Sequence, residues 1–338
     1  MKKYYLKKIG RIVLIALVLI SCDEEGAEPE PLGAPDDLEA SDEFALRVEL
    51  EWDKVDNAEE YIIYRATYED FWEYLDDENI EDLDEFNDDL EDEKLDMDDL
   101  EDAGFEKIDD TDDHEYIDTD VESSSIYYYF VTAENDDEGP ASEIVEGVTS
   151  TITTEEAFDF LAEETEGESY NASSASEVSS TIEVILDDHA KSGADLVFLI
   201  DNTGSMSDDI ANIRDNIFDL LEALPSGVKV GVAEYGDLNV DPSEWFDYID
   251  LTSDYDDIET YLNNLSTTGG GDIPESVYDG IWQAVDVMSW SSSTKMMIVI
   301  GDAPPLEGYL TEKTLKDVIE KCTEEGVTTN LYPILVGF

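Results

Sequence analysis

The sequence predicts two domains of different fold class: an antiparallel β-sandwich, followed by an α/β domain with a doubly wound parallel sheet. In residues 34–150, short runs of alternating apolar and polar residues are separated by turn residues. From residue 193 onward, apolar strand-like runs alternate with segments whose apolar residues recur at helical spacing. A length of 338 residues also suits two domains.

The chain is extremely acidic, with 90 Asp and Glu against 17 Lys and Arg and a formal net charge of −73. This charge excludes nucleic acid as a partner of the chain as a whole, because phosphate binding needs a basic surface. Because acids are spread over both predicted domains, we expect a halophilic surface whose self-repulsion is screened by salt. A calcium-loading surface is the alternative, although no stretch has the spacing and glycine of a calcium-binding loop.

The amino terminus predicts a signal peptide over residues 1–21. It starts with basic residues and continues into an apolar run, 12–20, that is too short to span a bilayer. Ser21 and Cys22 follow the run, and the sequence Leu19-Ile20-Ser21-Cys22 resembles the lipobox of bacterial lipoproteins. This resemblance implies that a lipid on Cys22 anchors the protein to the cell envelope, at the outer membrane or the cell surface. An ordinary signal peptide with a chance cysteine is the alternative. Residues 22–33 are expected to form an acidic tether.

Residues 34–150 contain strand-like runs at 44–52, 61–65 and 127–133. Together with Pro35, Leu38 and Asp118-Thr119, these runs resemble a fibronectin type III domain. The resemblance implies that Trp52 is the core tryptophan and Tyr127 the corner tyrosine, both with packing roles.

An acidic insertion interrupts this domain at about 68–103, where residues 69–102 hold 20 acids in 34 positions. Its apolar residues recur every three to four positions, which favours one or two amphipathic helices, and a solvated, partly disordered excursion is the alternative. Residues 151–192 are rich in Ser, Glu and Gly in their middle and are expected to be a linker, with a short helix at 154–161 and a strand at 182–186.

Residues 193–338 alternate strand-like runs (196–200, 228–232, 296–300, 331–336) with helix-like segments (210–220, 277–288). A ligand site is therefore expected at the carboxyl ends of the parallel strands. Polar clusters follow three of the apolar segments, and each offers hard oxygen atoms that suit Mg²⁺ better than zinc. The clusters contain Asp201, Thr203 and Ser205; Asp272 in a Gly-Gly-Gly-Asp-Ile-Pro-Glu loop; and Asp302 in Gly-Asp-Ala-Pro-Pro.

Together these clusters resemble the von Willebrand factor A domain and its metal-ion-dependent adhesion site. The resemblance implies that Thr203 and Ser205 are hydroxyl ligands of a divalent cation, and that Asp201 and Asp302 act directly or through water. Mg²⁺ is the first choice of ion, with Mn²⁺ or Ca²⁺ as alternatives. Asp272 stands where most of the family has a threonine ligand. Helix N-capping is the alternative role for Ser205, and the family's usual further helix after 331–338 is not in the sequence.

No catalytic role is expected. His114 and His189 are surrounded by aspartates, which favours solvated side chains, and neither a Gly-x-Ser-x-Gly motif nor a phosphate-binding loop occurs. Cys322 is interpreted as a small buried apolar residue. The sequence therefore predicts a lipid-anchored binding or adhesion protein whose metal is completed by an acidic group of a protein partner. The alternatives are an accessory or scaffold subunit of an envelope complex and, less favoured, a secreted hydrolase.

Overall fold

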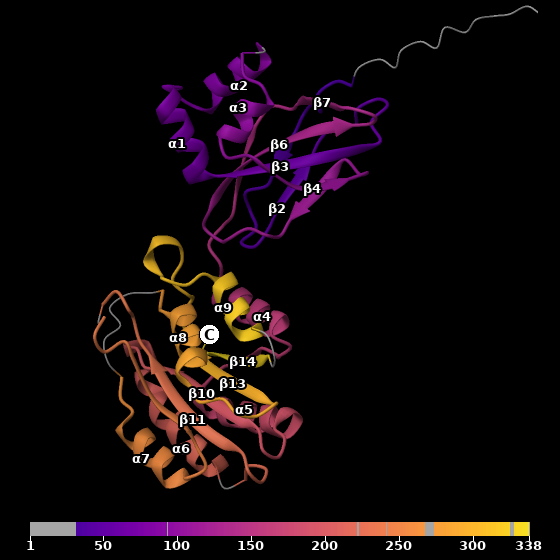
Figure 1. Ribbon diagram of the computed structural model, residues 1–338. Coiled ribbons are helices and arrows are strands. Elements are labelled where there is room, and N and C mark those ends of the chain that lie inside the picture. The colour runs from indigo at the N-terminus through magenta and orange to yellow at the C-terminus, as the bar shows by residue number, and fades with distance from the viewer. Residues whose placement is uncertain are drawn as a thin grey trace, which may run out of the picture.

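The structure, a computed structural model, describes residues 32–92, 94–221, 223–240, 242–267, 274–324 and 328–337. It contains a β-sandwich and an α/β domain, joined near residue 150 (Figure 1). The predicted signal peptide, Cys22 and most of the tether lie outside the described residues, as does Asp272. Among the helices of the described part, none is both long and apolar enough to cross a membrane.

The sandwich consists of two antiparallel sheets. One sheet has the order β1 (Glu39–Ala40), β2 (Val48–Glu51), β5 (Glu115–Asp118), and the other the order β4 (Glu106–Thr111), β3 (Glu60–Thr67), β6 (Ile126–Glu134), β7 (Glu138–Ala141), with β8 (Val145–Val148) also paired to β6. Trp52 is buried in the core between the sheets, edge-on to the Tyr61 ring at 5.4 Å. The Tyr127 hydroxyl accepts a hydrogen bond from the Glu122 backbone N–H at 2.9 Å. Both residues have the packing roles expected of them.

The acidic insertion forms three helices between β3 and β4: α1 (Tyr68–Glu78), α2 (Leu83–Glu91) and α3 (Met97–Asp102). Each helix begins with a side chain that caps its first turn, namely Thr67, Asp82 and Asp96. Phe71 and Phe86 pack in one apolar cluster with Phe130 of β6, so the helices cover the outer face of this sheet. This burial explains why β6 is apolar on both faces, and why a segment of such charge density is ordered.

The α/β domain has a six-stranded mixed sheet in the order β12-β11-β10-β13-β14-β9. Its strands are β9 (Tyr170–Ala172), β10 (Asp195–Asp201), β11 (Lys229–Tyr235), β12 (Phe246–Thr252), β13 (Lys295–Gly301) and β14 (Thr329–Val336). All neighbouring strands are parallel except β12, which runs antiparallel to β11 at the edge. The expectation of a purely parallel sheet is therefore wrong at this edge. The sequence did not predict β12 because Asp247 and Asp250 interrupt its apolar pattern.

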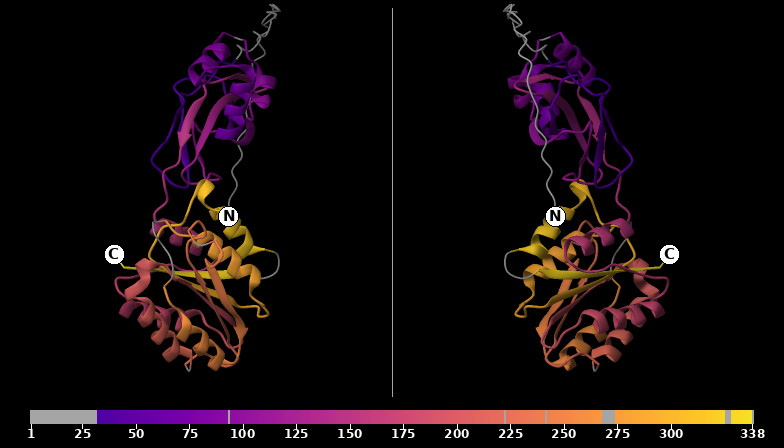
Figure 2. Two further views of the ribbon diagram at one scale, coloured as in Figure 1. Left: turned by 90° about the vertical axis from the view of Figure 1, so that its left-hand side faces the viewer. Right: turned by 90° about the vertical axis from the view of Figure 1, so that its right-hand side faces the viewer.

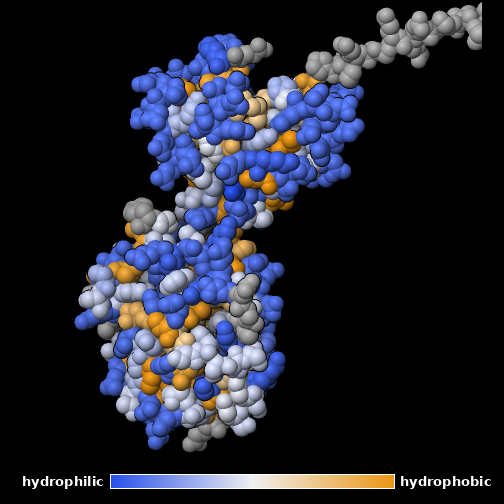
Figure 3. All heavy atoms as spheres, viewed as in Figure 1, coloured by the Kyte–Doolittle hydropathy of each residue, from blue (hydrophilic) through white to orange (hydrophobic). Residues whose placement is uncertain are grey.

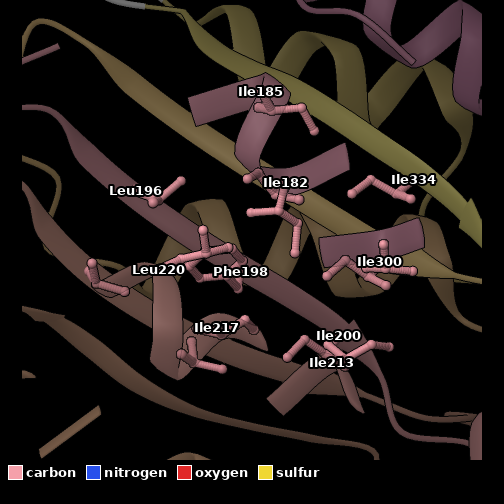
Figure 4. Packing of buried hydrophobic residues seen from close by; sticks show 14 of the residues in the cluster. Ile182, Ile185, Leu196, Phe198, Ile200, Ile213, Ile217, Leu220, Ile300 and Ile334 are labelled. Atoms are coloured by element: carbon pink, nitrogen blue, oxygen red, sulfur yellow. The ribbon is translucent and has the colours of Figure 1, made fainter. Parts of the chain in front are cut away.

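Helices cover both faces of this sheet (Figure 2). On one face, α5 (Ala175–His189), α6 (Ile210–Leu221) and α7 (Tyr255–Asn264) pack on side chains such as Phe198 and Ile200 (Figure 4). On the other face, α4 (Thr154–Glu164), α8 (Val277–Val287) and α9 (Leu315–Thr323) pack on Val197 and Leu199. Cys322 of α9 is buried in this second cluster, as expected for a small apolar residue.

The structure differs from the expectation of a linker at 151–192. This segment forms α4, β9 and α5, and β9 pairs with β14 as the last strand of the sheet. Residues 182–186 lie within α5 and not in a strand, because Val178, Ile182 and Ile185 form one helical stripe against the sheet. Elements that precede β10 in the chain, α4 and α5, thus cover the two faces of β14.

Candidate metal centre

Four of the five predicted metal ligands lie together at the carboxyl ends of two neighbouring strands. Strand β10 ends at Asp201 and leads into the 3₁₀ turn η1 (Gly204–Asp208), while the parallel strand β13 ends one residue before Asp302. The hydroxyl oxygens of Thr203 and Ser205 are 3.0 Å apart, and the Ser205 hydroxyl donates to Asp302 Oδ1 at 2.9 Å. The Thr203 backbone N–H donates to Asp201 Oδ1 at 2.8 Å. The fifth residue, Asp272, is outside the described part.

The cluster is partly open to solvent. Asp201 and Thr203 are fully buried, Asp302 is half-buried and Ser205 is exposed. Ser205 lies inside the 3₁₀ turn, and no side chain caps that turn with a hydrogen bond. Its hydroxyl donates to a carboxylate from another strand end, so the N-capping alternative is not what the structure has.

Glu275, which was not among the predicted ligands, also belongs to this site. It is 2% exposed, and its carboxyl group is close enough to Asp201 for the Asp201 charge, after burial, to raise its pKa. Backbone hydrogen bonds hold its loop beside the Asp302 loop: the Glu275 N–H donates to Pro304 O at 2.9 Å, and the Leu306 N–H donates to Glu275 O at 2.8 Å. The only sequence signal was its place at the end of the glycine-rich loop, where an acid just before a helix has a simpler explanation in the helix dipole.

The pKa values of the two buried carboxyl groups, Asp201 and Glu275, are raised. Burial, and secondarily the charge of Asp302, raise the pKa of Asp201 to about 7 against the hydrogen bonds from Thr203. Burial, followed by the charges of Asp201 and Asp237, raises the pKa of Glu275 to about 8. Asp201 Oδ2 and Glu275 Oε2 are buried and have no hydrogen-bond partner within the described part. A cation would relieve both the charge repulsion and the unpaired oxygens.

The donor set decides which ions fit. Among the described residues, no three His, Cys, Asp or Glu side chains are grouped so that they could hold a metal ion by themselves. An ion here would therefore depend on the hydroxyl oxygens of Thr203 and Ser205 as well as on carboxylates. An all-oxygen set suits Mg²⁺, Mn²⁺ or Ca²⁺ and does not suit zinc.

Residues 195–329 match the family model of the von Willebrand factor A domain. The alpha-protein kinase vwkA of Dictyostelium discoideum is 31% identical over 116 residues, which are 32% of this chain and 18% of the kinase. The chain thus matches less than a fifth of that relative's length.

Similar solved structures include fibronectin type III domains. The FN5 domain of Drosophila Lar is 16% identical with a TM-score of 0.24, covering 36% of this chain and 98% of that domain. A β-1,2-glucanase from Parabacteroides distasonis is 19% identical with a TM-score of 0.25, covering 40% of this chain and 15% of the glucanase. The match to the family model, together with the α/β fold, identifies residues 195–329 as a von Willebrand factor A domain.

Proposed function

We propose that the α/β domain is a divalent-metal-dependent binding module of a lipid-anchored bacterial envelope protein, and that it binds an acidic group of a protein partner. The observation that supports this proposal most directly is the pair of buried, unpartnered carboxylate oxygens, Asp201 Oδ2 and Glu275 Oε2. Leaving a buried acceptor unsatisfied costs about 1–3 kcal/mol, and more when it is charged. A site that keeps two such oxygens beside two hydroxyl groups is suited to a hard cation.

The ion would be held by Asp201, Thr203, Ser205 and Asp302 from the two strand ends, with the buried Glu275 carboxylate beside the site. Asp272 keeps its proposed role on the family resemblance alone. When bound, the ion would supply an electrophilic centre for a partner's carboxylate. The residues of the chain hold the site in shape, since Asp201 orders the Thr203 backbone and Ser205 joins the two strand ends through Asp302. The exposed position of Ser205 marks the side from which a partner would approach.

Calorimetric titration tests the proposal. The chain from residue 22 onward is titrated with MgCl₂, MnCl₂ and CaCl₂. The buffer contains about 1 M NaCl, because screening at this ionic strength suppresses diffuse binding to the acidic surface. We expect one saturable site in the wild type and its loss in Ser205→Ala and Asp302→Ala. Ser207→Ala, on the same 3₁₀ turn, is the matched control and should bind like the wild type. Saturable binding that persists unchanged in Asp302→Ala would place the ion elsewhere and contradict the proposal.

A further inference from the structure

We infer that Glu307 is a positioning residue of the metal centre: by holding Glu307, the sandwich raises the affinity of the site for its cation. This inference rests on the proposed function and concerns the regulation of that same site. Glu307 ends the segment 302–307, which begins at the proposed ligand Asp302 and follows β13 on the side of the α/β domain that faces the sandwich (Figure 1). One end of the segment therefore lies in the metal centre and the other at the sandwich.

The sandwich holds the Glu307 carboxylate with two hydroxyl groups. Ser124 Oγ donates to Glu307 Oε2 at 2.8 Å, and the Ser123 hydroxyl donates to Oε1. Both serines lie in the turn between β5 and β6, and Ser123 is buried. Hydrogen bonds to an ionised carboxylate are roughly twice as strong as those between neutral groups. Because each carboxylate oxygen has its own donor from the other domain, the position of Glu307 is set by the sandwich.

At its other end the segment is tied to the metal centre. Ser205 Oγ donates to Asp302 Oδ1 at 2.9 Å. Strand β13 ends at Gly301, and its pairing with β10 extends to Ile300. The position of Asp302 therefore has two supports: the strand pairing before it, and the contact of Glu307 with the sandwich after it.

The residues between these two ends leave little freedom to absorb a displacement. Pro304 and Pro305 have φ angles fixed by their rings. Ala303 and Leu306 are buried at 2% and 4% exposure. The backbone on both sides of Pro305 is hydrogen-bonded to Glu275, through Pro304 O and the Leu306 N–H. A shift of Glu307 is therefore passed on to Asp302 and to the Glu275 loop, and is not taken up within the segment.

The metal-free site gives this support a role in ion binding. Besides burial, the charge of Asp302 raises the pKa of both Asp201 and Glu275, so these carboxylates repel one another when ionised. Holding Asp302 in place against this repulsion keeps the site in the arrangement that an ion needs, and such preorganisation increases affinity. Since coupling of binding free energies is reciprocal, a bound ion favours docking of the sandwich by the same factor.

Replacing both sandwich donors, in Ser123→Ala/Ser124→Ala, tests the inference and leaves every residue of the α/β domain unchanged. Coupling between two sites typically changes affinity about 5–150-fold. We therefore expect the Mg²⁺ dissociation constant, measured by calorimetry in about 1 M NaCl, to rise at least about fivefold. Ser125→Ala is the matched control. Its hydroxyl lies in the same turn and donates to Ser123 O, so this variant disturbs the turn but not Glu307, and it should bind Mg²⁺ like the wild type.

Two further measurements separate positioning from general destabilisation. Glu307→Gln should also raise the dissociation constant, and combining it with the serine double variant should produce no further rise, because both changes remove the same contact. Small-angle scattering in about 1 M NaCl should show that MgCl₂, compared with EDTA, lowers the radius of gyration of the wild type. The serine double variant and Ser205→Ala, which lack the contact and a metal ligand respectively, should show no such change.

Unchanged Mg²⁺ affinity in the serine double variant, with normal binding by the wild type, would overturn the inference and leave the proposed function intact. An equal loss of affinity in Ser125→Ala would also overturn it, since disturbance of the turn would then be the cause. The same holds if the effects of Glu307→Gln and the serine double variant add, or if MgCl₂ changes the radius of gyration equally with and without the contact. If the wild type binds no Mg²⁺, the proposed function itself fails, and the role of Glu307 fails with it.

Discussion

Lys316 of the α/β domain and Asp120 of the sandwich form an ion pair across the domain interface, with Nζ and Oδ1 2.7 Å apart. Beside it, the Glu307 carboxylate accepts hydrogen bonds from the Ser123 and Ser124 hydroxyls. A cavity of about 950 Å³ lies between the domains, so the interface is incompletely filled. Glu307 is five residues beyond Asp302, which brings one loop into contact with both the metal centre and the sandwich.

Replacing Lys316 should loosen the domain interface without unfolding either domain. Residues 34–150 carry 46 acids and five basic residues, and residues 151–338 carry 39 and seven, so the domains repel each other. An exposed ion pair contributes only about 0–1 kcal/mol to stability. We therefore expect Lys316→Ala to change the free energy of unfolding by no more than this amount. Small-angle scattering in low salt should show a larger radius of gyration. Lys313→Ala, a control on the preceding loop, should not, and equal radii for both variants would contradict the prediction.

Salt should stabilise the whole protein. Hydrophilic side chains cover most of the sandwich surface in the view of Figure 3, and smaller apolar patches appear on both domains. Raising ionic strength from about 0.1 M to 1 M shortens the screening length from about 10 Å to 3 Å, which weakens the repulsion within the compact state. We expect the melting temperature to rise substantially with NaCl and equally with KCl. Stabilisation by calcium alone would indicate specific loading of the acidic surface.

Ile182 of α5 should be a core residue of the α/β domain. It is buried in the cluster that packs on β10 and β13 (Figure 4). We expect Ile182→Ala to lower the free energy of unfolding by about 2–5 kcal/mol, as for large-to-small changes in a packed core. Val184→Ala, on the exposed side of the same helix, should cost no more than about 0.5 kcal/mol. Denaturant unfolding measures both, and similar small effects would show that this segment is the linker that the sequence suggested.

The strands and helices that the sequence predicted correctly have an apolar pattern that fits only one kind of element. Central parallel strands such as β10 are buried on both faces and are therefore unbroken apolar runs. The edge strand β12 was missed because Asp247 and Asp250 interrupt it; their side chains accept from the backbone N–H groups of Tyr248 and Leu251. Helix α5 was missed because its serine-rich start hides an apolar stripe that is visible only over three turns.

At the candidate site, too, the sequence by itself shows as a group only residues that are close to one another in the chain. Asp201, Thr203 and Ser205 follow one another at a strand end, so their grouping is visible in the sequence. Glu275 is brought to the site by another element, and an acid before a helix has an ordinary explanation. What distinguishes it is a buried oxygen without a partner, which exists only once the chain is folded.

Cys22 should be required for membrane association. If a lipid on this residue anchors the protein, the wild type should fractionate with membranes and incorporate labelled palmitate. Cys22→Ala should block processing or release the protein, because an acyl chain supplies the burial of apolar surface that holds it to the bilayer. Cys322→Ala is the matched control, since that thiol is buried in the α/β core. A wild-type protein found in the soluble fraction would contradict the lipid anchor.

The stability of the metal-free protein should fall as pH rises from about 5 to 8. The pKa of Asp201 is raised to about 7 and that of Glu275 to about 8. In this window the folded state therefore holds protons that the unfolded state has released, and stability decreases with pH. Mg²⁺ binding requires the ionised carboxylates, so saturating Mg²⁺ should flatten or reverse the trend.

Melting temperatures in EDTA and in MgCl₂, both in about 1 M NaCl to limit general repulsion, check this. Glu275→Gln should have a shallower pH dependence in EDTA, because one of the two titrating carboxyls is gone. Glu259→Gln serves as the matched control, since this glutamate is exposed on α7. If Glu275→Gln and the wild type lose stability equally steeply between pH 5 and 8, the pH dependence arises from the surface charge and not from the buried pair.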